Sequence, residues 1–125
     1  MADQVKRQWR WYSPRNEGQP VAKRELLDLP KHGQGALIAA MKRYSTGSER
    51  SGEVKPIEDH LMELRTQVGN DPFRLIFFRD TPVHAIALHV FYKNQKKLPR
   101  QNKKIAKDRL KTWRQAHRDD VDTRD

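Results

Sequence analysis

Five ionisable side chains recur at alternate positions in three short segments of this chain. They are Glu63 and Arg65 in the first segment, Arg74 in the second, and His89 and Lys93 in the third. Because alternate residues of a β-strand share a face, these side chains can form one cationic surface with a single carboxylate. Arginine and lysine bind anions, and histidine can exchange a proton near neutral pH. The pattern therefore favours a functional site.

Each of these residues also has a purely structural interpretation. Glu63 and Arg65 can pair with neighbours across the sheet, and His89 can be a hydrogen-bonded packing residue. What favours function is the presence of all five on one face, next to a lysine-rich turn. That arrangement depends on strand register. It requires that the opposite face of the sheet, which packs against the helices, is formed by the apolar residues Met62, Leu64, Leu75, Phe77, Ile86, Leu88 and Val90.

The stretch 92–118 is strongly basic. It carries eleven lysines and arginines against one acid, Asp108, so it alone has the formal charge of +10 that the whole chain has. Such a segment attracts phosphates and releases counterions, which predicts RNA binding that weakens steeply with salt. The alternative is a solvated helix that only keeps the protein soluble. The side chains expected to bind RNA are Lys96, Lys97, Arg100, Lys103, Lys104, Lys107 and Lys111.

Other kinds of chemistry are disfavoured. The chain has no cysteine, which excludes disulfides and thiolate chemistry. Its histidines have no metal-ligand spacing, and it has no glycine-rich phosphate loop or serine elbow, so we expect no metal and no cofactor. No apolar stretch has the length of a signal peptide or a membrane span, so we expect a cytoplasmic protein without a membrane partner.

The elements that must position these residues follow from the hydrophobic period. Two segments of helical spacing, separated by Pro30, predict a helical hairpin. After a polar loop, three segments of period two, separated by turn sequences, predict a three-stranded antiparallel meander. The expected strands are 9–13, 60–68, 73–79 and 83–93, the hairpin spans 20–47, and a basic helix covers 101–117.

The fold class is therefore predicted to be α+β, with an N-terminal strand, a helical hairpin, the meander and a basic C-terminal helix. We expect a single domain at 9–118, between a basic flexible arm at 1–8 and an acidic flexible tail at 119–125. A DNA-binding helix-turn-helix at 21–44 is disfavoured, because its second helix is apolar and nearly uncharged until Lys42.

Three local motifs follow one another along the predicted meander. They are Glu63-Leu64-Arg65, Phe73-Arg74-Leu75, and the stretch 88–99, LHVFYKNQKKLP. Their order, together with the order of the predicted elements over 9–113, resembles the RelE/HigB superfamily of bacterial toxins. The likeness is greatest to the HigB-type branch of phages and prophages. The resemblance implies a RelE-like fold.

The resemblance also implies a function. It implies the toxin of a type II toxin-antitoxin system, an mRNA interferase that cuts messenger RNA on the ribosome and inhibits translation. In that family the RNA's own 2′-hydroxyl attacks the adjacent phosphodiester without a metal. The implied partners are mRNA, ribosomal RNA and a cognate helix-turn-helix antitoxin of the HigA type. Whether a chaperone acts on that antitoxin is left open.

Site residues can be carried over from the family one by one. Arg74 and Lys93 match the arginine and the strand-end residue that contact the scissile phosphate in the family. Arg65 matches a basic position of the Glu-Leu-Arg motif, and Lys97 extends the phosphate clamp. These matches predict that Arg65, Arg74 and Lys93 are catalytic.

The general base is left open by the resemblance. Some family members have a proton-transferring lysine at the position of Glu63, although the HigB-type branch has glutamate. His89 is the candidate by chemistry, since histidine titrates near neutral pH, and Tyr92 and Lys93 are alternatives. Val90 stands where relatives often have glycine.

Two other functions compete with the nuclease. A non-catalytic RNA-binding protein would need only the basic helix. A gyrase-poisoning branch of the same superfamily shares the fold but acts on a protein target. The combination of Arg74, Lys93 and Lys97 favours the nuclease, because the gyrase branch generally lacks it.

Overall fold

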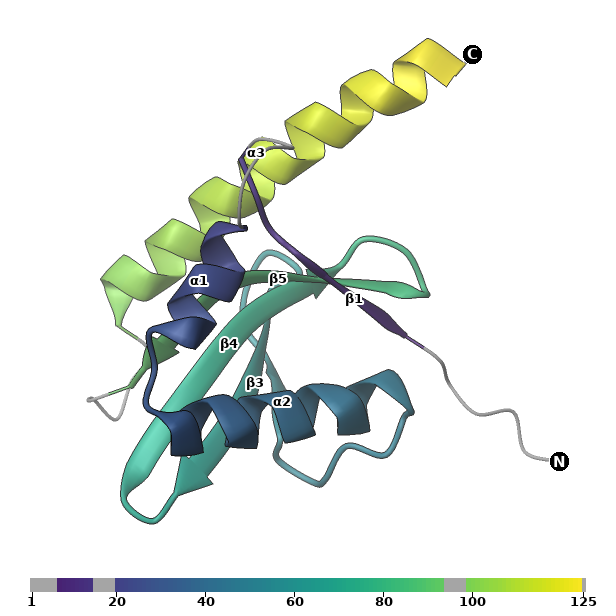
Figure 1. The fold of residues 1–125 in the computed structure, drawn as a ribbon. Coiled ribbons are helices and arrows are strands. Elements are labelled where there is room, and N and C mark those ends of the chain that lie inside the picture. The colour runs from purple at the N-terminus through teal and green to yellow at the C-terminus, as the bar shows by residue number, and fades with distance from the viewer. Residues whose placement is uncertain (1–6, 15–19, 94–98, 125) are drawn as a thin grey trace, which may run out of the picture.

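The chain forms a five-stranded sheet in the order β1-β5-β4-β3-β2, with helices on both faces (Figure 1). The computed structural model describes residues 7–14, 20–93 and 99–124, with side chains as far as residue 116. The strands are β1 (Gln8–Trp11), β2 (Val54–Pro56), β3 (Met62–Val68), β4 (Asp71–Arg79) and β5 (His84–Tyr92), and the helices are α1 (Val21–Leu27), α2 (Lys31–Ser45) and α3 (Arg100–Arg124).

The predicted α+β fold is confirmed. The N-terminal strand, the helical hairpin α1–α2, the antiparallel meander β3-β4-β5 and the C-terminal helix occur in the predicted order. Two features differ: β1 pairs with β5 in parallel, so the sheet is mixed, and β2 lies in a stretch predicted to be a loop. The loop was predicted because this stretch is polar and lacks the alternation of a half-buried strand. Three of its residues nevertheless pair with β3 and form the edge strand of the sheet.

Two observations concern the ends of the chain. Arg7, within the predicted flexible arm, donates to the main-chain oxygen of Tyr44 and pairs with Glu49 at 3.2 Å. Residues 1–6 lie outside the described residues. At the other end, α3 continues to Arg124 and so includes most of the stretch expected to be an acidic tail.

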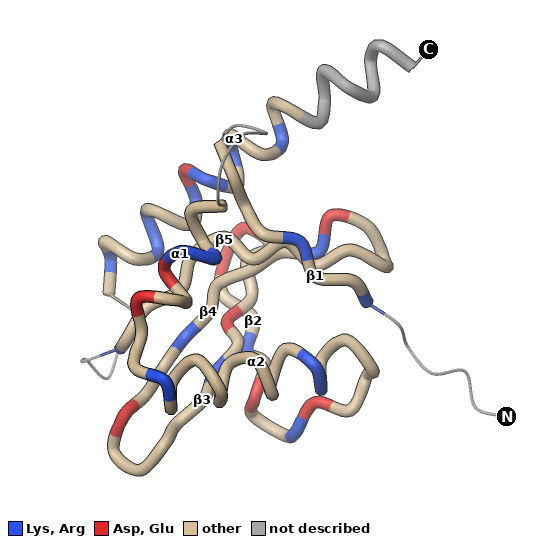
Figure 2. The backbone as a smooth tube through the Cα atoms, in the orientation of Figure 1, with Lys and Arg blue, Asp and Glu red and all other residues tan. Residues whose placement is uncertain are grey.

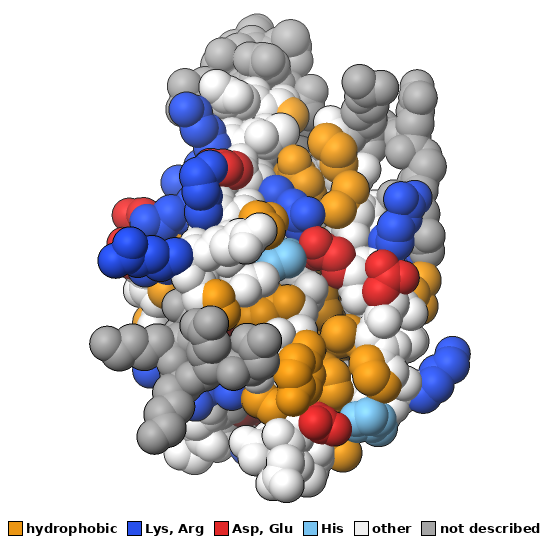
Figure 3. Space-filling view, turned by 90° about the vertical axis from the view of Figure 1, so that its left-hand side faces the viewer, with side chains coloured by type: hydrophobic (Ala, Val, Ile, Leu, Met, Phe, Trp, Pro, Cys, Tyr) orange, Lys and Arg blue, Asp and Glu red, His pale blue; other side chains and the backbone are white. Residues whose placement is uncertain are grey.

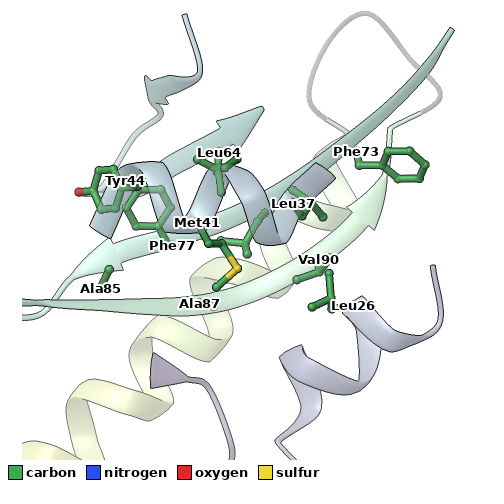
Figure 4. Close-up of a cluster of buried hydrophobic side chains, with 12 residues drawn as sticks. Leu26, Leu37, Met41, Tyr44, Leu64, Phe73, Phe77, Ala85, Ala87 and Val90 are labelled. Atoms are coloured by element: carbon green, nitrogen blue, oxygen red, sulfur yellow. The ribbon is translucent and has the colours of Figure 1, made fainter. Parts of the chain in front are cut away.

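The first hydrophobic cluster lies between α2 and the sheet. Leu37, Met41 and Tyr44 recur at helical spacing on α2 and pack against residues of β3 and β4 such as Leu64 and Phe77 (Figure 4). The approach is close at the start of α2, where a Cβ on Gly33 would lie 2.6 Å from the ring of Phe73.

A β-bulge changes the face of two predicted core residues. Ile76 pairs with His89, whereas Phe77 pairs with Ala87, so Leu88 has no partner on β4. One extra residue reverses the alternation of a strand. Val90 therefore faces α2, but Ile86 and Leu88 face α3, and the prediction that all three share one face was wrong.

This reversal adds Ile86 and Leu88 to the second hydrophobic cluster, which also contains Ile76 and Phe78 of β4. Ile86 and Leu88 pack with Ala106, Leu110 and Trp113 of α3. The face predicted to be open is therefore covered by α3 over much of its length. Viewed from the side of α1, the surface has a hydrophobic patch bordered by charged side chains (Figure 3).

Candidate functional site

One end of the α3-covered face holds a cluster of charged residues. We call Glu63, Arg65, Arg74 and Lys93 the basic cluster. Arg65 lies directly opposite Arg74 in the β3–β4 pair, and Lys93 follows the end of β5, where its N–H donates to the oxygen of Pro72. Glu63, Arg74 and Lys93 are at most 7% exposed. The structure thus brings together three of the four predicted catalytic residues.

Within the basic cluster the charges are close but not hydrogen-bonded to one another. Glu63 Oε1 lies 3.7 Å from Arg65 Nε, and Glu63 Oε2 lies 3.7 Å from Arg74 Nε. Among the described residues, Glu63 Oε2 and both Nε atoms are buried without a hydrogen-bond partner. An unmade hydrogen bond of a buried group costs about 1–3 kcal/mol, and a catalytic role or a bound water or ion is among the explanations for such a group.

The position of Arg74 is fixed by the main chain. Its Nη1 donates to the oxygen of Thr66 at 2.7 Å and to that of Phe73 at 2.9 Å. The Nε edge of the guanidinium therefore faces Glu63 in a set orientation. A guanidinium held in this way is suited to bind a phosphate oxygen.

The ammonium group of Lys93 is destabilised by its surroundings. Burial is the main cause that lowers its pKa below the ordinary value, and the positive charges of Arg74, Arg65 and Lys55 act in the same direction, while Glu63 opposes them. A lysine with a lowered pKa among other cations is a candidate for proton transfer. Sequence reasoning missed Lys55, which lies opposite Glu63, because it missed β2.

His89 has other neighbours. Its Nδ1 lies 2.9 Å from a carboxylate oxygen of Glu25, and its Nε2 lies 2.7 Å from Nδ2 of Asn102. The ring stacks on Phe91, which lies directly opposite Arg74. The register does place His89 on the face of the basic cluster, but both ring nitrogens are occupied by partners from α1 and α3.

Glu25 connects three elements. It accepts hydrogen bonds from His89, from the N–H of Val90 at 3.1 Å, and from both Nη atoms of Arg109 at 2.9 and 3.0 Å. Burial raises its pKa, but the bonds from His89 and Arg109 outweigh it, so the pKa lies below the ordinary value. Arg109 also donates to the oxygen of Leu88 at 2.7 Å. This network attaches α1 and α3 to β5, and no local sequence signal indicated it.

Within the described part of the chain, the predicted RNA-binding residues on α3 divide into those that form ion pairs and those that do not. Figure 2 shows that lysines and arginines recur along the described part of this helix. Lys103 and Lys107 pair with Glu58, and Lys104 pairs with Asp108. Arg100 and Lys111 are exposed and have no ion pair among the described residues, whereas Lys96 and Lys97 lie outside them.

Lys111 lines a hollow of about 510 Å³ between α3 and the turn before β3. Lys107 and Arg114 of α3 line the same hollow, opposite Asp59 and His60. These two turn residues have positive φ angles, 56° and 67°, as in the tight turns that join hairpin strands. The hollow is a second basic surface, formed mainly by α3.

Two further findings concern the described part of the chain. No three of its histidine, aspartate and glutamate side chains are grouped so that they could hold a metal ion. None of its helices is long and apolar enough to cross a membrane.

Comparison with known proteins identifies the family. Residues 24–111, which include the whole basic cluster, match the family described as "Phage derived protein Gp49-like (DUF891)". The chain belongs to this family. It is also 40% identical over 111 residues to proteins named "Probable endoribonuclease HigB1" in two strains of Mycobacterium tuberculosis, a match that covers 89% of this chain and 88% of each relative.

Proposed function

We propose that this chain is a HigB-like toxin of the RelE/HigB superfamily, and that it is an endoribonuclease that cuts messenger RNA on the ribosome. The observation that carries the proposal is the basic cluster, which offers two guanidinium groups and a lysine of lowered pKa to one phosphodiester. Membership of the Gp49-like family and the likeness to the HigB1 relatives support it.

In the proposed reaction, the RNA's 2′-hydroxyl is the nucleophile. Arg65 and Arg74 bind the non-bridging oxygens of the adjacent phosphate and stabilise the charge that develops there. The 2′-oxygen forms a bond to phosphorus and its proton passes to the neutral amine of Lys93. The bond from phosphorus to the 5′-oxygen breaks, and that oxygen takes a proton from the solvent. The products are a 2′,3′-cyclic phosphate and a 5′-hydroxyl end.

Lys93 is preferred to His89 as the general base because of its surroundings. His89 has a partner at each ring nitrogen, and its ring stacks on Phe91, the residue directly opposite Arg74. Lys93 is adjacent to both arginines, and its lowered pKa makes the neutral amine accessible. Glu63 balances the charges of Arg65 and Arg74.

The proposed partners follow from this function. The exposed Arg100 and Lys111 are candidates for contacts with ribosomal RNA, and Lys96 and Lys97 remain predictions. An antitoxin, proposed to be a helix-turn-helix protein of the HigA type, would cover exposed apolar surface such as the patch in Figure 3. A chaperone for that antitoxin, a cytoplasmic location and a single domain at 9–118 also remain predictions.

The proposal can be tested in cells by inducing the gene and sequencing the 5′ ends of total RNA, with translation active or blocked. We expect discrete new ends within coding regions, which disappear when translation is blocked. Unchanged RNA together with DNA damage would contradict the nuclease and favour the gyrase-poisoning branch. Unchanged RNA and salt-dependent RNA binding alone would favour a non-catalytic protein.

A further inference from the structure

A second hollow, of about 320 Å³, lies between α2 and the outer edge of β3. Ala36 and Ala39 of α2 line one side, and Arg65 and Gln67 of β3 line the other; Arg50 also lines the hollow. Its volume is within the range of sites that hold small organic molecules. Arg65 lines this hollow and also belongs to the basic cluster, so it is the residue that the two have in common.

The edge of β3 is uncovered at this hollow. The N–H of Arg65 donates to the oxygen of Glu53 at 2.7 Å, just before β2 begins at Val54. Along an antiparallel strand, the main-chain groups of every second residue point toward the same neighbouring strand. Those of Gln67 therefore point to the same side as the N–H of Arg65, away from β4. No residue of β2 pairs with Gln67. Its N–H and C=O are therefore placed to bond to a ligand in the hollow.

The charge of the hollow favours an anion. Glu53 is the one carboxylate among the described residues that line the hollow. It accepts hydrogen bonds from Arg43 Nε at 3.0 Å and from the N–H of Arg50 at 3.0 Å, and it forms an ion pair with Arg43 Nη2. Glu53 therefore balances Arg43. Arg50 is exposed and forms no ion pair among the described residues, and about a third of the Arg65 side chain, 37%, is exposed. These two arginines leave a net positive charge.

We propose that this hollow is a subsite for one nucleotide of the RNA, adjacent to the cleaved bond. The phosphate of that nucleotide lies on Arg65 and Arg50, and its base lies against the methyl groups of Ala36 and Ala39 with its polar edge toward Gln67. This proposal rests on the proposed function, because Arg65 also holds the scissile phosphate there. The subsite would give the enzyme a base preference beside the cut.

The first test measures cleavage of mRNAs with randomised codons on ribosomes. Ala39→Leu fills the hollow with a residue that favours helix, and Lys42→Leu adds leucine to the same helix outside it. We expect the parent and Lys42→Leu to share a base preference at one position beside the cut. Ala39→Leu should weaken that preference about tenfold, as when one base contact is lost. An unchanged preference in folded Ala39→Leu overturns the subsite.

A second variant avoids any effect on helix packing. Arg50→Ala removes an exposed side chain, and Arg24→Ala removes an exposed arginine of α1 as the matched control. We expect Arg50→Ala to raise KM severalfold with little change in kcat, because it binds a phosphate that does not react. Equal kinetics for the two variants would contradict a role for Arg50.

A binding measurement tests the subsite independently of the nuclease activity. Ribodinucleotides of all base combinations are titrated into the full chain, and amide chemical shifts are followed. We expect base-dependent shifts at Ala36, Ala39 and Gln67 that disappear in Ala39→Leu. Such shifts without any RNA cleavage would support the subsite and contradict the proposed function. Cleavage with no such shifts would overturn the subsite and leave the nuclease intact.

Discussion

Replacing Arg74 with alanine is expected to lower the rate of RNA cleavage by about 10²–10³-fold, the usual effect of removing one group that stabilises developing charge. The guanidinium is buried and held by two main-chain oxygens beside Glu63. Its charge is therefore fixed where the phosphate is proposed to lie. The measurement is the single-turnover cleavage rate on mRNA bound to ribosomes, with growth arrest as a second readout.

The control must separate catalysis from folding. The alanine variant also loses the hydrogen bonds to Thr66 and Phe73, so its unfolding temperature is measured in parallel. Arg65→Ala is the companion variant, because Arg65 is more exposed and its Nε has no hydrogen-bond partner among the described residues. We expect Arg65→Ala to cleave slowly while it unfolds near the parent temperature. Folded variants that both cleave at the parent rate would exclude this site.

Replacing Lys93 with arginine is expected to lower cleavage by about 10²–10⁴-fold, the usual contribution of general acid-base catalysis. Arginine keeps the positive charge but does not release its proton in proteins. Lysine acts as a base only when neutral, which requires a pH near or above its pKa. Burial and the neighbouring arginines lower that pKa. The parent rate should therefore rise with pH, and level off at a lower pH than an exposed lysine would allow.

The pH profile of the variant provides the control. In Lys93→Arg, the cleavage rate should no longer rise with pH as Lys93 loses its proton, and the rate should stay low at every pH. If Lys93 acted only through its charge, the arginine variant would cleave near the parent rate, and the parent rate would fall with rising pH. Either of these results would contradict the role of Lys93 as the base.

The part of the site on β3 and β4 could be predicted from the sequence. The alternation around Glu63 and Arg65 and the turn at Gly69–Pro72 set the register of the hairpin, which places Arg65 directly opposite Arg74. A tight turn leaves few alternative registers. The shared face of these residues was therefore determined by local signals.

The rest of the site depends on contacts that local patterns do not encode. The bulge at Leu88 has no signature in a strand that is apolar on both faces, and it sends Ile86 toward α3. The partners of His89 come from α1 and α3, and Glu25 is 64 residues away in sequence. Likewise, Glu58 pairs with Lys103 and Lys107 from a distant turn. Counting charges alone therefore overestimated the number of α3 lysines that are free to bind RNA.

The most direct test of the central claim is the chemistry of the RNA ends. Purified protein is added to ribosomes that carry a defined mRNA, and the ends at the cut are analysed. A matched mRNA has a single 2′-deoxynucleotide at the cleaved position. Attack by the RNA's own hydroxyl predicts a 2′,3′-cyclic phosphate and a 5′-hydroxyl, and no cut at the 2′-deoxy position. A 5′-phosphate end, or equal cleavage of the 2′-deoxy substrate, would contradict the account.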